Sequence, residues 1–355
     1  MDEHPEFSEV IIKTIADDKL DWAHFVRLCS NHLILPVIYL KFKTHKLIEH
    51  LPDELVEFFR EIYELNLARN EQILLQINDI LKLLNANDIY PTFLKGTGNL
   101  LDGLYSDKGE RMIGDIDFLV PEKDYLKAAK ILEDEGYSRD PIFYGDIKDA
   151  KHYPGLFKTG SLATIEVHRL LVSNLYSKKF NPETIQKKRI VFAEKQSCFV
   201  LCDRHNAILN FIHSQLAHKA NLNGIISFRD IYDLYLISKR IAFPPILNEI
   251  QFKRKAITYF VFAGKALGLP LRFYQYETFA SKIFLLKHSL NYNSPLFYKS
   301  YSTCIFLSDR IFRGYIGRVF KSIYSQNERQ IIIDCLGNRQ WYSDHFESYK
   351  SFFKL

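Results

Sequence analysis

The chain has 355 residues, of which 47% are hydrophobic and 25% charged, so its composition argues against a disordered or fibrous protein and its length predicts two or three packed units. Its net charge of +5 is modest, and its five scattered cysteines form no Cys-x-x-Cys pair, which argues against a disulfide scaffold or zinc ribbon. Because no signal peptide and no stretch of ~18–20 apolar residues is found, we expect a cytoplasmic protein without a transmembrane segment.

The first 88 residues have a helical pattern. Between Glu71 and Leu84, apolar residues recur at helical spacing, and the polar run 85–88 supplies a stop. The short apolar run 89–94 predicts a strand, and Pro91 favours a place at the strand's edge or start.

A glycine-bearing turn at residues 95–98 follows, then a short helix to Tyr105 and a polar loop over 106–111. Polar and apolar residues alternate at the start of residues 115–120, and the last three are all apolar, which predicts a strand that enters the core. Residues 124–135 predict a helix, which Gly136 would end.

Residues 156–158 and 162–168 read as a hairpin, and after residue 204 the pattern is helical again. We therefore predict an α+β fold in which a small mixed β-sheet lies between helical regions. The expected parts are an amino-terminal helical region over 1–88, a catalytic core over 89–203, and a basic helical region over 204–355.

Two carboxylates two residues apart, Asp115 and Asp117, lie at the start of the predicted strand 115–120. On a strand they point to the same face, where they can share divalent ions. A third carboxylate, Glu166, lies in a separate predicted strand with His168 on its face. Three converging acids are costly without cations between them, and the glycine turn before them offers backbone N–H groups for phosphate oxygens. The pattern indicates a metal and phosphate site.

Several short motifs accompany these carboxylates. They are Leu94-Lys95-Gly96, Leu104-Tyr105, Arg111, Asp115-Ile116-Asp117-Phe118-Leu119-Val120, Gly136-Tyr137, His152 and Ile165-Glu166-Val167-His168, with Asp21-Trp22, His32, Pro36 and Tyr39 before them and His213, His218, Arg229-Asp230 and Asp233 after them. Together they resemble the uncharacterised nucleotidyltransferase family of the polymerase β-like superfamily, which is commonly associated with bacterial polysaccharide gene clusters. At the turn, the wider superfamily usually has Gly-Gly or Gly-Ser, whereas this chain has Lys95-Gly96-Thr97.

This resemblance implies a catalytic site and a reaction. Asp115, Asp117 and Glu166 would be catalytic and would bind two Mg²⁺, with Mn²⁺ as an alternative, and a nucleoside monophosphate would pass from an NTP such as ATP to a hydroxyl or phosphate with release of pyrophosphate. The acceptor is unidentified, with a saccharide or another anionic molecule as candidates. The residues expected to bind the nucleotide are Lys95, Gly96, Thr97, Arg111, His152 and His168.

Other residue patterns have ordinary explanations. Arg229, Asp230 and Asp233 permit local ion pairs at helical spacing, and His213 and His218 are too far apart around a helix to chelate well. Beyond residue 240 there are 16 Lys and Arg against 7 Asp and Glu, a charge of +9 that leaves −4 on the rest. This basic region is either a set of solvated helix faces or a surface for a polyanion or for peripheral contact with anionic lipid.

Three other functions fit parts of the pattern. A glycosyltransferase also uses Asp-x-Asp, although it would normally begin with a longer nucleotide-binding domain than this helical start allows. A non-catalytic nucleotide-binding or scaffold protein of the same fold is expected if Glu166 does not reach the metal site. A toxin-like transferase acting on tRNA would use the basic region to bind RNA, but nucleic acid is not the favoured partner class.

Overall fold

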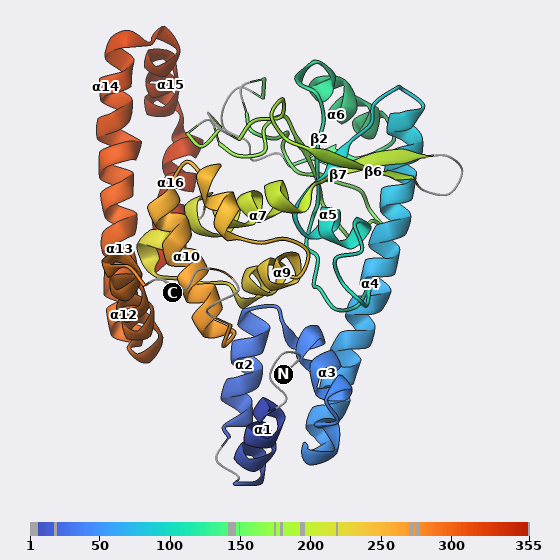
Figure 1. Cartoon of the computed structure of the whole chain (residues 1–355). Helices are drawn as coiled ribbons and strands as arrows, with labels where there is room; N and C mark the ends of the chain where they lie inside the picture. The colour runs from blue at the N-terminus through green and yellow to red at the C-terminus, as the bar shows by residue number, and fades with distance from the viewer. Residues whose placement is uncertain are drawn as a thin grey trace. The chain divides into compact units, whose positions relative to one another are not determined.

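The computed structural model describes residues 6–17, 20–140, 147–148, 150–173, 175–177, 180–191, 196–217, 219–269, 273 and 277–353 (Figure 1). The chain divides into two compact units. Unit 1 comprises Met1–His218 and Ile226–Glu277, and unit 2 comprises Lys219–Ile225 and Thr278–Leu355. The division of the chain at residues 88 and 203 stays a prediction.

Helices precede the sheet of unit 1, as the sequence predicts. They are α1 (Glu6–Ala16), α2 (Trp22–Asn31), α3 (Leu35–Thr44), the 3₁₀ turn η1 (Ile48–His50) and α4 (Asp53–Asn85). Their apolar faces form a core of their own, in which Phe25 of α2 packs against Phe42 and Phe59 at ring-centroid distances of 6.3 and 6.5 Å. The first half of α4 belongs to this core, and its second half belongs to the sheet.

A mixed sheet forms the centre of unit 1. Within the described residues it has seven strands in the order β3-β4-β5-β2-β1-β7-β6. Their bounds are β1 (Thr92–Phe93), β2 (Ile116–Leu119), β3 (Ser138–Arg139), β4 (Leu156–Phe157), β5 (Ile165–His168), β6 (Lys187–Val191) and β7 (Ser197–Leu201). The pairs β2–β5 and β1–β7 are parallel and the others are antiparallel. The predicted α+β class with a small mixed sheet is confirmed.

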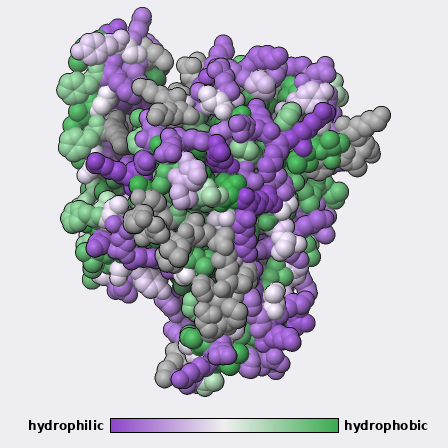
Figure 2. Space-filling model, in the orientation of Figure 1, coloured by the Kyte–Doolittle hydropathy of each residue, from purple (hydrophilic) through white to green (hydrophobic). Residues whose placement is uncertain are grey.

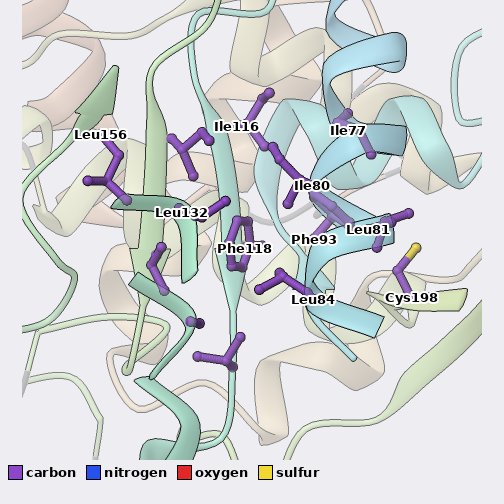
Figure 3. Close-up of a cluster of buried hydrophobic side chains, with 14 of the residues drawn as sticks. Ile77, Ile80, Leu81, Leu84, Phe93, Ile116, Phe118, Leu132, Leu156 and Cys198 are labelled. Carbon is purple, nitrogen blue, oxygen red and sulfur yellow. The ribbon is translucent and has the colours of Figure 1, made fainter. Parts of the chain in front are cut away.

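The main hydrophobic core lies between this sheet and two helices, α4 and α6 (Tyr125–Asp134). Figure 3 shows α4 side chains beside those of the strands, among them Ile77, Ile80, Leu81, Leu84, Phe93, Ile116, Phe118 and Leu132. On β2 and β5 the alternate residues face this core, which leaves the residues between them on the other face. The period of the strands therefore decides which side chains are available to a site.

Several predicted elements are found with changed bounds. The strand expected over 89–94 is only β1, because Pro91 cannot donate a ladder hydrogen bond and the chain turns into α5 (Lys95–Leu101). The strand expected over 115–120 is β2, and the predicted hairpin is the antiparallel pair β4–β5. The hairpin β6–β7 was not predicted.

Further helices follow the sheet in both units. Unit 1 continues with α7 (Asp203–Phe211), the π-helical turn η4 (Ile212–Ala217), α9 (Phe228–Ser238), η5 (Pro244–Asn248) and α10 (Lys253–Ala266), and it includes the earlier turn η2 (Glu122–Asp124). Unit 2 comprises α8 (Ala220–Asn223), α12 (Phe279–Asn293), α13 (Pro295–Asp309), η6 (Arg310–Ile316), α14 (Gly317–Tyr324), α15 (Gln326–Gly337) and α16 (Arg339–Phe353).

No single helix in the described ranges has the length and apolar character needed to cross a bilayer. The pair α2–α3 meets this measure only when its two helices are taken together, and they are bent by 119°.

Candidate functional site

Strands β2 and β5 bring two carboxylates side by side. The strands run parallel with Asp117 opposite Glu166 and Phe118 opposite Val167. Ile116 and Phe118 are fully buried beneath α4 and α6, so the alternation of the strand directs Asp117 to the other face of the sheet. Residues in register on neighbouring strands face the same way, and the structure therefore brings Asp117 and Glu166 together.

One imidazole and one ammonium group link these carboxylates. His168 Nε2 lies 2.9 Å from Asp117 Oδ1 and 3.1 Å from Glu166 Oε2. Because an ionised carboxylate only accepts hydrogen bonds, Nε2 carries a proton and donates to both. Lys95 Nζ lies 2.6 Å from the same Asp117 oxygen and 3.8 Å from Glu166 Oε2. The two acids thus share two donors on the face of the sheet that the core leaves open.

These contacts shift the titration of Glu166. The hydrogen bond from His168 lowers the pKa of Glu166, and this effect outweighs the desolvation that raises it. The charge of Lys95 lowers the pKa of Glu166 further. Glu166 therefore stays ionised and available as a ligand well below neutral pH.

Asp115 lies at the edge of the same acidic group. It is the residue before β2, and its carbonyl oxygen accepts a hydrogen bond of 2.9 Å from the Thr97 hydroxyl. Burial raises the pKa of the Asp115 carboxyl, and the charges of Asp117 and Glu166 raise it further. Three carboxylates therefore act on one another, which is the electrostatic cost that a bound cation would remove.

The turn that carries Lys95 is tightly packed. Gly98 lies so close to β1 that an added Cβ would be 2.6 Å from the Phe93 carbonyl oxygen, so no other residue fits without moving the backbone. Gly96 and Thr97 are buried in the first turn of α5. Their expected role in binding phosphate stays a prediction.

Arg111 belongs to a different cluster. Its Nε and Nη2 donate to the Asp233 carboxylate at 3.0 and 2.9 Å, and Nη1 donates to the Met112 carbonyl oxygen. Burial disfavours the guanidinium, yet the attraction of Asp233 keeps the pKa of Arg111 above its ordinary value. An added Cβ at Gly96 would lie 3.6 Å from the Arg111 guanidinium carbon, so this cluster packs against the turn at Gly96. The structure does not place Arg111 with the acidic group, and its binding to phosphate stays a prediction.

The pairing of Asp233 differs from the local ion pairs expected on its helix. Asp233 of α9 binds Arg111, 122 residues earlier, and accepts a hydrogen bond of 2.9 Å from the Tyr105 hydroxyl. The local ion pair is that of Arg229 with Asp230, at 3.9 Å. The spacing alone could not reveal the distant partner. Of the two histidines in the preceding stretch, His213 lies in η4 and His218 lies outside the described residues.

His152 and its neighbour Lys151 lie beside the acidic group. The His152 ring is 5.1 Å from the His168 ring, and its Nδ1–H donates to the Tyr153 carbonyl oxygen at 2.8 Å. Burial lowers the pKa of His152 and also that of Lys151, which the charge of Lys95 lowers further. Lys151 was not among the predicted site residues, although it adjoins the predicted His152.

Polar residues of α4 support the loop before Asp115 and were also missed. Asn66 and Asn70 donate to the Arg111 carbonyl oxygen at 3.2 and 2.8 Å, and Arg69 donates to the Ile113 carbonyl oxygen at 3.3 Å. Both asparagines are buried on a helix whose inner face is otherwise largely apolar. The sequence signal for this support is a pair of amides at helical spacing among the apolar residues of a helix, because buried amides need polar partners.

The residues present fit a hard divalent cation. Within the described parts of the chain, the ligand atoms of Asp117, Glu166 and His168 lie within 4.8 Å of one another. The Asp117 and Glu166 oxygens, with Asp115 nearby, are the donors that Mg²⁺ and Mn²⁺ prefer. His168 Nε2 already donates to both acids, whereas its buried Nδ1 has no hydrogen-bond partner among the residues that the structure describes. The oxygens are therefore the better ligands, and the imidazole orients them.

Comparisons with known proteins give a matching family. A family described as "Uncharacterised nucleotidyltransferase" matches residues 18–268. No curated protein matches the chain. One solved structure to which it is similar is an antigenic nucleotidyltransferase-like protein from Paracoccidioides brasiliensis, with 14% identity, a TM-score of 0.38, and coverage of 57% of this chain and 93% of that chain.

Proposed function

Because the chain belongs to the uncharacterised nucleotidyltransferase family, we propose that it transfers a nucleoside monophosphate from an NTP to an acceptor hydroxyl or phosphate, with release of pyrophosphate. The observation that carries this proposal is the register of β2 and β5, which places Asp117 beside Glu166 on the face of the sheet away from the main core. The same register argues against a non-catalytic protein in which Glu166 lies away from the site.

The proposed cofactor is Mg²⁺, with two ions bound by Asp115, Asp117 and Glu166 and with Mn²⁺ as a substitute. When bound, the metal would supply positive charge against the polyphosphate and would lower the pKa of the acceptor hydroxyl. His168 would hold the Asp117 and Glu166 oxygens in place through Nε2–H. Lys95 would neutralise charge on the leaving pyrophosphate.

The acceptor and the setting are finer proposals. A saccharide or another anionic molecule is the proposed acceptor, ATP is a proposed donor, and the proposed location is the cytoplasm. A role in polysaccharide biosynthesis rests on the resemblance alone. The pairing of Lys95 with two acids supports binding of a phosphorylated donor, because an ammonium group can exchange carboxylate for phosphate oxygens.

A labelling experiment tests the proposed reaction. The protein is incubated with Mg²⁺ and each NTP labelled on its α-phosphate, and label transfer to a cell lysate and pyrophosphate release are both measured. We expect activity in the wild type and in Asp134→Asn, a control on the exposed face of α6, and none above background in Asp117→Asn. Equal pyrophosphate release from the wild type and Asp117→Asn would contradict the proposal.

A further inference from the structure

Lys95 has a backbone conformation that its residue type disfavours. Its φ is +52°, in the left-handed region, where a residue with a Cβ pays ~1–2 kcal/mol and glycine pays little. A strained residue persists where its surroundings fix it, and such residues cluster at functional sites. The strained backbone of Lys95 therefore points to a functional role for its side chain.

The ammonium group of Lys95 lies where a shared metal ion would lie. Its Nζ is 2.6 Å from Asp117 Oδ1 and 3.8 Å from Glu166 Oε2, and only 20% of its side chain is exposed. A divalent cation shared by these acids would stand about 2.0–2.6 Å from their oxygens. Two cations at that range from the same oxygens repel each other strongly.

We propose that Lys95 is a built-in counter-ion of Asp117 and Glu166, which must leave these carboxylates before they share a metal ion. The inference rests on the proposed function, because it takes the metal and the NTP as ligands of this site. In the free protein, Lys95 holds the acids together and weakens metal binding. When nucleotide arrives, its phosphate oxygens give the displaced ammonium group a new partner, so nucleotide and metal bind cooperatively.

A second ammonium group strengthens this coupling. Lys151 is half-buried next to His152, whose ring lies 5.1 Å from the ring of His168, and the charge of Lys95 acts on it. A phosphate group that enters beside the acids thus meets two ammonium groups, one of them released from Asp117. A metal ion entering alone meets both as repulsive charges.

A metal titration tests this proposal without measuring turnover. Mn²⁺ is titrated into the full-length protein, and free Mn²⁺ is followed by electron paramagnetic resonance, with and without a non-hydrolysable NTP analogue. We expect Lys95→Met to bind Mn²⁺ at least about tenfold more tightly than the wild type when nucleotide is absent, since a unit charge is removed within ~4 Å. The increase in affinity caused by nucleotide should shrink. Lys123→Met, an exposed lysine before α6, is the charge-matched control and should behave as the wild type.

The outcomes separate this inference from the proposed function. Lys95→Gly removes the same charge and relieves the backbone, and it replaces Lys95→Met if that variant fails to fold. If the wild type binds Mn²⁺ with nucleotide but both variants bind it equally or more weakly without nucleotide, the counter-ion role is wrong and the proposed function stands. If the wild type binds no Mn²⁺ even with nucleotide, both are wrong.

An independent observation concerns a helical stretch of unit 2. In η6 and α14, Phe312, Ile316, Val319 and Ile323 recur at helical spacing, and they are 64%, 40%, 58% and 57% exposed. This stripe is an apolar helix face turned to solvent. Figure 2 shows hydrophobic residues on the surface of this part of unit 2, along the left edge of the view.

Positive charge accompanies this apolar stripe. Residues 310–327 contain four Lys and Arg and no Asp or Glu, and Arg318 and Lys321 are exposed. The sequence of unit 2 has 12 Lys and Arg against 5 Asp and Glu. A second copy of so basic a unit would be repelled, whereas an anionic bilayer would be attracted. We infer that the stripe binds the surface of an anionic membrane, with its apolar side chains in the headgroup region and its basic groups at the lipid phosphates.

Vesicle flotation tests this surface. The full-length protein is mixed with phosphatidylcholine vesicles with or without phosphatidylglycerol. We expect flotation only with the anionic vesicles, with losses of about tenfold or more in Phe312→Ser/Val319→Ser and in Arg318→Glu/Lys321→Glu. Leu286→Ser, an exposed change on α12, is the control and should still float. No flotation of the wild type, or equal flotation with neutral vesicles, would overturn the proposal. A dimer that Phe312→Ser/Val319→Ser dissociates in light scattering would also overturn it.

Discussion

Two buried charged clusters contact the first turn of α5, and they differ in how fully their charges are matched. In the first, Arg111 donates through Nε, Nη1 and Nη2 to Asp233 and a carbonyl oxygen. In the second, Asp117 and Glu166 share His168 and the ammonium group of Lys95, and Asp115 adds a third negative charge. In the first cluster, the protein itself supplies the partners of the Arg111 guanidinium. In the second, the negative charge of the carboxylates exceeds the positive charge that the protein supplies.

This difference separates a structural role from a binding role. A buried ion pair with matched hydrogen bonds is costly to break and offers nothing to a ligand. Carboxylates that raise the pKa of a neighbouring carboxyl, as Asp117 and Glu166 do for Asp115, are stabilised when a cation binds. We therefore expect changes in the first cluster to affect folding and changes in the second to affect chemistry.

The largest effect is expected at Asp117. Asp117→Asn keeps the shape of the side chain but removes a metal ligand, and metal charge supplies several kcal/mol in such reactions. We expect nucleotidyl transfer to fall by about a thousandfold or more, while the melting temperature stays within a few degrees of the wild type. Steady-state pyrophosphate release and thermal denaturation measure the two quantities. If Asp117→Asn retained activity, the acidic cluster would have a structural role, as the Arg111 cluster does.

The next effect is on folding, at Asp233. Asp233→Ala leaves the buried Arg111 guanidinium without its carboxylate, which should lower the free energy of unfolding by about 3–5 kcal/mol. Urea denaturation measures this value. Replacement of the exposed Asp134 by Ala is the control, and its effect should stay below about 1 kcal/mol. If Asp233→Ala unfolded like the wild type, the cluster around Arg111 would have no structural role.

A smaller effect is expected at Asn70, which connects α4 to the loop before the acids. Asn70→Leu leaves the Lys108 and Arg111 carbonyl oxygens without this donor, and we expect a loss of about 1–3 kcal/mol in unfolding free energy. Because that loop leads to Asp115, activity should fall as well. A variant with lower stability but full activity would show that the loop does not position the acids.

The smallest effect is a pH dependence with opposite signs at two acids. The folded pKa of Asp115 is raised, chiefly by burial, so its ionisation costs stability as the pH rises from its ordinary pKa through the folded value. Asp115→Asn should therefore gain stability over the wild type as the pH rises above about 4, by less than about 1 kcal/mol. The folded pKa of Glu166 is lowered, chiefly by His168, so Glu166→Gln should lose stability at neutral pH and lose less as the pH falls. Unfolding free energies at several pH values would show whether the two curves diverge.

Much of the sheet and of the acidic site could be predicted from sequence, because both depend on local periodicity. The alternation of residues 115–120 and 162–168 predicts two strands and the facing of Asp117 and Glu166. The sequence predicts that the acids converge on adjacent strands but does not predict their register, and the parallel pairing of β2 and β5 places Asp117 opposite Glu166. The roles assigned to the site residues remain predictions.

The parts that were missed depend on distant contacts. Arg111 lies in a loop and its partner Asp233 lies 122 residues away on α9, and no local spacing encodes that distance. Lys151 approaches the acids through an irregular segment before the bridge between His152 and His168, so periodicity gives no sign of it. The left-handed backbone of Lys95 was also hidden, since a lysine gives no hint of a conformation that glycine prefers.

The most direct test is to locate a metal ion in crystals of the protein grown with Mn²⁺ and a non-hydrolysable NTP analogue. Anomalous scattering identifies Mn²⁺ without reference to activity. We expect a peak bound by Asp117 and Glu166 oxygens, with Lys95 turned away from both carboxylates. Nucleotide bound elsewhere, or an ammonium group still between the two acids with no metal beside them, would contradict the proposed site.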